Sequence, residues 1–483
     1  MVRSRFAPSP TGQMHIGNLR TALYEYLIAK HSGGTFILRI EDTDQNRYVE
    51  GATDIVIKTL GIAGLIHDEG PGVGGNYGPY FQSERKASYL PYAKELIEKG
   101  AAYYCFCSKE KLENLDEAYE QDQQQKYDRH CFSLSKDEVS AKLAAGEPYV
   151  IRQFIPEGKT TFHDEVFGDI TIDHEEIEDQ ILIKSDGMPT YNFANVIDDH
   201  LMEITHVVRG SEYLTSTPKY KLLYEAFGWD VPVYVHLPLL LGDHGGKMSK
   251  RKGDPSFDDL LAQGYLPEAV INYVAFLGWS SPDNREYFTL SELVEVFDYK
   301  HISKSPSSFD VKKLAWMNGE HIKRLSEDVF YEMALPTLQS AIKTPGIDLK
   351  EIARLVQSRV LFVRDSIELV DFIDQLPDYD IALFTHKKMK TDPVVAMAAL
   401  EAIIPVYKDI AVDDWNNDTL YAAAVACGQA KECKNSQILW PIRTALSGKP
   451  SSPCGASELC ALLGKDETLK RLEIGIEKLR KAD

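Results

Sequence analysis

Arg5-Phe6-Ala7-Pro8-Ser9-Pro10-Thr11-Gly12, followed by His15-Ile16-Gly17-Asn18, is the stretch that decides the fold. Residues 2–7 are extended, the Pro- and Gly-rich turn follows, and leucines then recur at helical spacing. Gly33-Gly34 ends this helix, and the apolar run 35–40 predicts a second strand. Two parallel strands joined by a helix form the opening unit of a nucleotide-binding α/β sheet. The unit carries no G-x-G-x-x-G motif, so it lacks a dinucleotide fingerprint.

The rest of the chain indicates that this sheet is split and then followed by helices. A chain of 483 residues exceeds the roughly 250–300 residues of a single core, so several domains are expected. A polar, Gln-rich stretch at 117–126 and the alternating run 149–154 differ from the sheet, whereas the apolar run 231–241 resumes it. We therefore predict an α/β fold, with a Rossmann-like parallel-sheet domain interrupted by an α+β insertion. The predicted parts are the sheet domain (1–75 and 188–255), the insertion (76–187) and two mainly helical regions (256–325 and 326–483).

Composition limits the setting and the partners. Hydrophobic residues make up 44% and charged residues 26%, a balance typical of soluble globular proteins. No apolar run approaches the roughly 20 residues that span a bilayer, and the basic start has no apolar signal-peptide core behind it. Seven scattered cysteines indicate a reducing compartment, so we expect a cytoplasmic protein with no membrane partner. The net charge of −20 disfavours a nucleic-acid partner unless basic residues gather locally.

Two segments have the residue types that phosphate binding requires. His15-Ile16-Gly17-Asn18 stands at a helix start, where free N–H groups and the helix dipole attract phosphate, although a capping turn with an incidental histidine would look the same. The run Gly246-Lys247-Met248-Ser249-Lys250-Arg251-Lys252-Gly253 places four cations in six residues. It is either a solvated surface cluster or a mobile loop for a triphosphate.

Together these segments resemble the HIGH and KMSKS signatures of class I aminoacyl-tRNA synthetases. The sequence departs from them at Asn18 and Arg251, as is common in the glutamyl branch. Further runs resemble motifs of that branch in its bacterial type: Arg5–Gly12, Arg39–Asp44, His206–Glu212 and Lys313–Asn318. The resemblance covers the whole chain and is strongest through about residue 320. It implies that the insertion binds the tRNA acceptor end, that 256–325 contacts the stem, and that the helical region 326–483 binds the anticodon.

The resemblance also implies an activity. It is the ATP-dependent attachment of L-glutamate to tRNA-Glu through a glutamyl adenylate, with release of AMP and pyrophosphate. The family is usually monomeric, and Mg²⁺ is implied by ATP use. The chemistry requires positioning and charge stabilisation rather than a protein nucleophile. The implied catalytic residues are His15, Lys247 and Lys250. The implied ATP-binding residues are Ser9, Thr11, Gly12, His15, Gly17, Asn18, Met248, Ser249 and Lys250.

Glutamate recognition is likewise carried over from the family. Arg5 and Arg209 match positions that bind the two carboxylates, and Glu41 matches the residue that receives the α-ammonium group. The remaining pocket wall matches Ala7, Ser9, Tyr191 and Asn195. Each arginine could instead close an internal ion pair. Arg209 favours glutamate over glutamine, because a buried cation without a γ-carboxylate would be left unpaired.

Three features leave alternatives open. Cys105, Cys107 and Cys131 resemble a zinc site of some bacterial relatives, but the expected histidine position holds Ser133, so either His130 completes the site or the thiols are vestigial. Arg354, Arg359 and Arg364 are anticodon-contact candidates or solvated charges, and we expect Arg359 to make the contact.

The rival functions are a glutaminyl-tRNA synthetase, a shorter glutamyl-queuosine paralogue, a small-molecule nucleotidylyltransferase and a non-catalytic tRNA-binding protein. Whether tRNA-Gln is also charged cannot be decided from these motifs.

Overall fold

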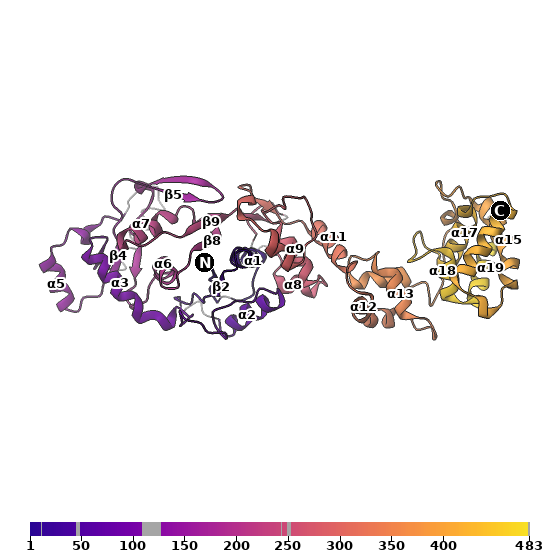
Figure 1. The fold of residues 1–483 in the computed structure, drawn as a ribbon, viewed down its shortest axis with the longest axis horizontal. Helices are drawn as coiled ribbons and strands as arrows, with labels where there is room; N and C mark the ends of the chain where they lie inside the picture. The colour runs from indigo at the N-terminus through magenta and orange to yellow at the C-terminus, as the bar shows by residue number, and fades with distance from the viewer. Residues whose placement is uncertain (11, 45–48, 109–126, 243, 249–252, 482–483) are drawn as a thin grey trace. The chain divides into compact units, whose positions relative to one another are not determined.

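The computed structural model describes the chain except residues 11, 45–48, 109–126, 243, 249–252 and 482–483 (Figure 1). The polar stretch expected to be helical at 117–126 therefore lies outside the described residues. The chain forms two compact units, the first made of residues 1–263 and 267–314 and the second of residues 264–266 and 315–483. Within the described part of the chain, no helix combines the length and apolarity needed to cross a membrane.

The predicted opening unit is confirmed. Strand β1 (Arg3–Phe6) leads into helix α1 (Ile16–His31), which returns to strand β2 (Thr35–Leu38). The two strands pair in parallel, with Arg3 opposite Thr35. The return requires glycine at position 34, because a Cβ there would lie 2.1 Å from the Val2 carbonyl oxygen.

The second half of the sheet joins β1 through strands β8 (His206–Gly210) and β9 (Val233–Leu237), which pair in parallel. The Thr205 amide donates to the Arg3 carbonyl at 2.9 Å, which links β8 to β1. The apolar run 231–241 is thus β9 followed by the short strand β10 (Leu240–Leu241). On the other edge of β9 lies the hairpin of β5 (Lys159–Asp164) and β6 (Gly168–Asp173), giving the order β6-β5-β9-β8.

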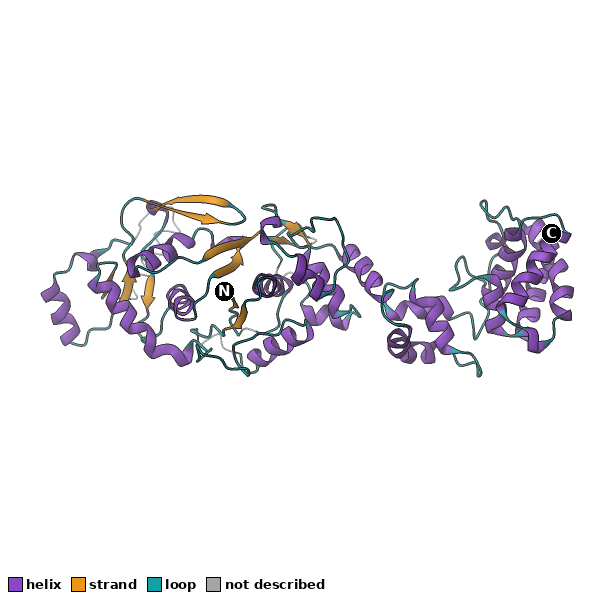
Figure 2. Cartoon of the chain, in the orientation of Figure 1, coloured by secondary structure: helices purple, strands orange, loops and turns teal. Residues whose placement is uncertain are grey.

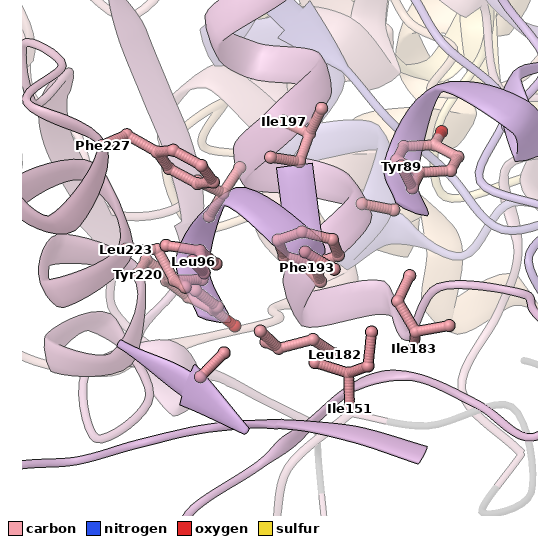
Figure 3. Packing of buried hydrophobic residues seen from close by; sticks show 14 of the residues in the cluster. Tyr89, Leu96, Ile151, Leu182, Ile183, Phe193, Ile197, Tyr220, Leu223 and Phe227 are labelled. Carbon is pink, nitrogen blue, oxygen red and sulfur yellow. The ribbon is translucent and has the colours of Figure 1, made fainter. Parts of the chain in front are cut away.

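The segment between the two halves contains an antiparallel sheet of order β3-β4-β7. Its side chains share one core with helices of the sheet domain, as Figure 3 shows for Ile151 of β4, Phe193 of α6 and Leu223 of α7. The elements of this region are α2 (Ala52–Ile62), α3 (Lys86–Glu98), β3 (Ala102–Cys105), α5 (Lys136–Ala144), β4 (Val150–Gln153), β7 (Ile181–Ile183), α6 (Tyr191–Leu201) and α7 (Thr217–Phe227). The shared core means that α6 is held firmly on the side facing away from the cleft described below.

The chain beyond residue 256 is mainly helical, as predicted (Figure 2). The first unit continues with α8 (Phe257–Ala262), α9 (Pro267–Ala275), α10 (Leu290–Val296) and β11 (Ser307–Ser308), and α11 (Val311–Ile322) follows. The second unit then contains α12 (Glu327–Ala341), α13 (Leu349–Gln357), α14 (Ser366–Val370), α15 (Pro393–Asp409), α16 (Asn417–Ala430), α17 (Asn435–Ser447), α18 (Ala456–Leu463) and α19 (Lys465–Lys481). Several of these helices begin at side chains that cap the free N–H groups, as Ser326 does for α12 and Asp392 for α15.

Candidate active site

A cleft of about 310 Å³ lies where β1 and β8 end and α1 begins, the edge at which open parallel sheets bind ligands. The predicted residues that line it are Arg5, Ala7, Ser9, His15, Gly17, Asn18, Glu41, Tyr191, Arg209, Lys247 and Met248. Of the described residues predicted for the site, Gly12 and Asn195 are not part of the lining. Thr11, Ser249 and Lys250 lie outside the described residues.

His15 is the N-cap residue of α1, and its Nδ1 accepts a hydrogen bond from the Gly17 amide at 2.9 Å. Burial, and then the positive charge of Lys247, lower the pKa of His15. A neutral imidazole that accepts through Nδ1 carries its proton on Nε2, so the ring presents one N–H donor. A side chain at position 17 would displace this ring, because a Cβ there would lie 2.7 Å from the His15 Cε1 atom.

The basic loop is described up to Met248, whose buried side chain and amide anchor it to the sheet. The Met248 amide donates to the Leu240 carbonyl at 2.9 Å. Lys247 is largely exposed and contacts Glu212 at 2.8 Å. Although burial raises the pKa of Glu212, the hydrogen bond from Lys247 brings it below its usual value, so the pair is ionised. Lys247 is therefore a surface cation that can exchange Glu212 for a phosphate oxygen.

Arg5 lines the cleft, as a ligand-binding residue would, and it also forms internal ion pairs. Its Nε and Nη2 donate to the two oxygens of Asp199 at 2.9 and 3.2 Å, and its Nη1 donates to Glu25 at 3.0 Å. Burial opposes the charge on Arg5, but Asp199 and Glu25 together outweigh burial and raise the pKa of the guanidinium. Arg5 is thus a fixed, permanently charged group at the cleft wall.

Arg209 differs from Arg5 because part of its guanidinium has no partner within the described part of the chain. Its Nη2 donates to the Asn195 side-chain oxygen at 2.8 Å, but its buried Nε and Nη1 make no hydrogen bond. Its guanidinium carbon lies 4.7 Å from the Tyr220 ring centre and 5.7 Å from that of Tyr213. Two unsatisfied donors on a side chain that is only 6% exposed are costly, and a carboxylate in the cleft would satisfy one of them and pair with the charge. Asn195 thus binds Arg209 and does not itself line the cleft.

Cys105, Cys107 and Cys131 converge, with all three sulfur atoms within 4.8 Å of one another. The Tyr127 hydroxyl lies 2.9 Å from the Cys105 sulfur and 3.6 Å from that of Cys107. Burial raises the pKa of Cys107 to about 11, and repulsion from Cys105 adds to this, so the Cys107 thiol holds its proton when no cation is near. His130, which the sequence left open as a fourth ligand, is exposed and does not belong to the cluster. Three soft sulfur donors and one oxygen fit a tetrahedral Zn²⁺ ion.

In the second unit, the arginines singled out from the sequence do not share one environment. Arg354 pairs with Glu351 on the surface at 2.6 Å, and Arg364 lies over the Phe362 ring at 4.0 Å. Arg443 has the environment expected of a ligand-binding residue, although no sequence pattern indicated such a role. Its guanidinium stacks on Trp440 at 4.1 Å, while its buried Nε and Nη2 have no hydrogen-bond partner among the described residues.

The surroundings of Arg443 explain why sequence spacing missed it. Burial lowers the pKa of Arg443, and no acidic group contributes to the shift. The centre of the His386 ring lies 4.1 Å from that of Trp440, and His386 begins a tight loop closed by hydrogen bonds between His386 and Thr391. That loop contains Lys387, Lys388 and Lys390. More than 50 residues of sequence separate His386 from Trp440, so only the fold brings them together.

Comparison with known proteins defines the class to which this fold and cleft belong. The catalytic-domain family of class I tRNA synthetases (E and Q) matches residues 1–316, and an anticodon binding domain family matches residues 329–476. The chain belongs to the class I tRNA synthetases of the E and Q group. This confirms the resemblance inferred from the sequence and, with it, an α/β catalytic domain followed by a helical anticodon domain.

The particular relatives share one description. The chain is 57% identical to the glutamate–tRNA ligase of Clostridium novyi, over 100% of this chain and 99% of that protein. It is also 57% identical to the glutamate–tRNA ligase of Lachnoclostridium phytofermentans, over 99% of each. A crystal structure of a glutamate tRNA ligase from Elizabethkingia meningosepticum, in complex with its amino acid, matches with a TM-score of 0.84 and 36% identity, covering 99% of both chains.

Proposed function

We propose that this protein attaches L-glutamate to tRNA-Glu at the expense of ATP, through a glutamyl adenylate and with release of AMP and pyrophosphate. Family membership and the full-length relatives support the reaction class. The observation that carries the choice of amino acid is Arg209, a buried guanidinium with two unsatisfied donors beside the cleft. A γ-carboxylate would accept from one of these donors and neutralise the guanidinium, whereas the amide of glutamine would direct N–H groups or a weaker acceptor at it.

The first step joins the glutamate α-carboxylate to the α-phosphate of ATP and releases pyrophosphate. The protein contributes positioning and charge stabilisation. The His15 Nε2–H is placed to donate to a phosphate oxygen at the start of α1, where the backbone amides add to the attraction. Lys247 neutralises charge on the departing side, and we expect Lys250 to do the same. Mg²⁺, when bound with ATP, would offset the remaining phosphate charge.

Glutamate would lie with its charged groups against three residues of the cleft wall. Arg209 holds the γ-carboxylate, Arg5 faces a carboxylate, and Glu41 receives the ammonium group. Tyr191, Ala7 and Ser9 complete the lining of the pocket. Because each charged group meets an opposite charge at low dielectric, a neutral side chain of the same shape should bind far more weakly.

We further propose that the remaining regions hold the tRNA, with residues 76–187 contacting the acceptor end, 256–325 the stem and 326–483 the anticodon.

The cysteine cluster would hold a structural Zn²⁺ through Cys105, Cys107 and Cys131, with Tyr127 as the oxygen donor. A bound Zn²⁺ would cross-link β3 to the segment around residue 131. Metal analysis of the purified, chelator-washed protein should find about one zinc per chain, lost in Cys131→Ser. Wild-type protein without zinc would refute this site.

Arg443 and the loop 386–390 support the anticodon assignment. A guanidinium stacked on an aromatic ring and carrying unsatisfied donors suits an unpaired base, and the three neighbouring lysines suit phosphates. These cations also answer the objection that a chain of net charge −20 repels tRNA, because binding depends on local rather than net charge. We expect the protein to act in the cytoplasm as a monomer.

The test of the proposed function is charging of purified tRNA with labelled glutamate or glutamine. Wild-type protein should attach glutamate only, and Arg209→Gln should lose about 100-fold or more in kcat/KM for glutamate. Arg480→Gln, which removes an arginine from a surface ion pair with Glu401, is the control and should retain its kcat/KM for glutamate within about twofold. Attachment of glutamine by the wild type, or an unchanged Arg209→Gln, would overturn the proposal.

A further inference from the structure

A single carboxylate, that of Asp199, connects the charged residues of the cleft wall. It accepts two hydrogen bonds from Arg5, at 2.9 and 3.2 Å, and one from Arg39 at 2.8 Å. The Arg209 Nη2 lies 3.9 Å from the same carboxylate. Asp199 is 1% exposed, so these contacts form in the interior, where charges interact strongly.

The network continues from Asp199 to the third charged group of the cleft. Arg39 spans Asp199 and Glu41, because its other terminal nitrogen donates to the Glu41 carboxylate at 3.0 Å. Arg5, Arg209 and Glu41 line the cleft, whereas Asp199 and Arg39 do not. Asp199 therefore touches all three cleft groups directly or through one arginine, without being exposed to a ligand itself.

The position of Asp199 follows from the helix that carries it. Tyr191, Asn195 and Asp199 recur every fourth residue of α6 and so share one face of the helix. Tyr191 lines the cleft, Asn195 binds Arg209, and Asp199 binds Arg5 and Arg39. The opposite side of α6 is buried in the core of Figure 3, where Phe193 and Ile197 are labelled, so α6 presents this face rigidly.

We propose that Asp199 is a positioning residue for the amino-acid pocket, fixing the guanidinium groups of Arg5 and Arg39, and through Arg39 the Glu41 carboxylate, in the geometry that receives an α-amino dicarboxylate. The inference rests on the proposed function, since it concerns how the same pocket recognises glutamate. The cationic side chains of Arg5, Arg39 and Arg209 repel one another, and the Asp199 carboxylate that they all approach offsets this repulsion. Asp199 is ionised throughout the physiological range, because Arg5 and Arg39 outweigh burial and lower its pKa to about 2.

The neighbouring Asp198 provides a matched control. It is also fully buried on α6, but it accepts hydrogen bonds from Arg85 at 2.7 Å, Gln82 at 2.9 Å and Tyr89 at 2.9 Å, none of which lines the cleft. Asp198→Asn and Asp199→Asn thus make the same chemical change in adjacent buried positions. Only the second change removes a hydrogen-bond acceptor from the network of Arg5, Arg39 and Glu41, whereas Asp198 acts on Arg39 by its charge alone.

The experiment measures KM for glutamate, KM for ATP and kcat in tRNA charging by the full chain. Asp199→Asn should raise KM for glutamate about tenfold or more, because an amide N–H₂ would face the arginine donors, while KM for ATP stays within about twofold. Asp198→Asn should leave KM for glutamate within about twofold. Equal shifts in both variants, or no shift in Asp199→Asn, would refute the positioning role.

A second variant decides the question if Asp199→Asn does not fold. Asp199→Glu keeps the charge and moves it by one methylene, so a role in positioning predicts that KM for glutamate still rises about fivefold or more. A KM for glutamate equal to that of the wild type would refute the inference. Failure of the proposed function itself would be visible separately, because the wild-type protein would then attach no glutamate.

Discussion

Gly17 and His15 form a unit in which the glycine makes room for the imidazole. A Cβ at position 17 would lie 2.7 Å from the ring, and the ring is the group that can move. We expect Gly17→Ala to lower kcat for charging by about tenfold or more, since His15 loses its hydrogen bond to the Gly17 amide and its direction toward the phosphates. The free energy of unfolding should change little, because the about 1 kcal/mol by which alanine favours a helix over glycine offsets a similar cost of losing the N-cap hydrogen bond.

The control for this prediction is Gly61→Ala in α2, where a Cβ would meet no atom within 4 Å. It should leave kcat unchanged and should not destabilise the protein. Charging kinetics and urea unfolding of the two variants separate a local steric effect from a general one. Normal kcat in Gly17→Ala would show that the orientation of His15 does not matter for the reaction.

Glu25 is a buried carboxyl group whose protonation should affect stability. Burial raises its pKa from 4.5 to about 8, although Arg5 opposes the shift. Between these values the folded chain holds a proton that the unfolded chain has lost. The contribution of Glu25 is therefore complete below pH 4.5 and is lost as the pH rises through about 8, with a limiting slope of about 1.4 kcal/mol per pH unit.

Glu25→Gln tests this prediction because the substitution imitates the protonated form. One carboxyl oxygen accepts from Arg5 and from the Val208 amide, and the other has no partner among the described residues, so an amide fits. The free energy of unfolding of the variant minus that of the wild type should increase from about pH 4.5 to about pH 8 and then level off. A difference that is constant with pH would contradict a raised pKa.

Helices α1 and α6 show how far the sequence could predict the site. The turn before α1 and the position of His15 were predictable, because Pro, Gly and helical spacing act locally. The spacing of Tyr191, Asn195 and Asp199 on α6 was also present in the sequence, but nothing local indicated what faces Asp199. Arg5 and Arg39 contact it across 194 and 160 residues of sequence, which only the folded sheet brings together.

The loop 386–390 and helix α17 form the element that we expect to bind the anticodon. Arg443→Gln should raise KM for tRNA-Glu about tenfold or more, because it removes both the stack on Trp440 and the free donors, and KM for glutamate should stay constant. Arg480→Gln, which removes an exposed arginine paired with Glu401, is the matched control. Equal KM values for tRNA in the two variants would place the contact elsewhere, for example at Arg359.

At the scale of the whole molecule, the predicted order of an α/β catalytic domain followed by a helical anticodon domain is confirmed, but the boundaries could not be derived from composition. Helix α11 runs from residue 311 to 322 and passes the division at 314/315 without any Pro, Gly or polar linker at that point. Likewise, the predicted insertion 76–187 contributes to the same core as α6 and α7, so no break in hydrophobicity marks its ends. Such boundaries depend on which apolar faces pack together, which is a property of the tertiary structure.

The net charge of −20 predicts an unusual dependence of charging on salt. The acidic protein and the tRNA repel each other at long range, and salt screens this repulsion over a Debye length of about 10 Å at 0.1 M salt. The local contacts of lysine and arginine with phosphates weaken with salt instead. We therefore expect kcat/KM for tRNA, at constant Mg²⁺, to rise between about 10 and 100 mM KCl and to fall above about 200 mM. KM for glutamate should change little over the first range, because its binding depends on buried charges that salt does not screen. A steady fall of kcat/KM from the lowest salt would mean that local cations control the approach of tRNA even at long range.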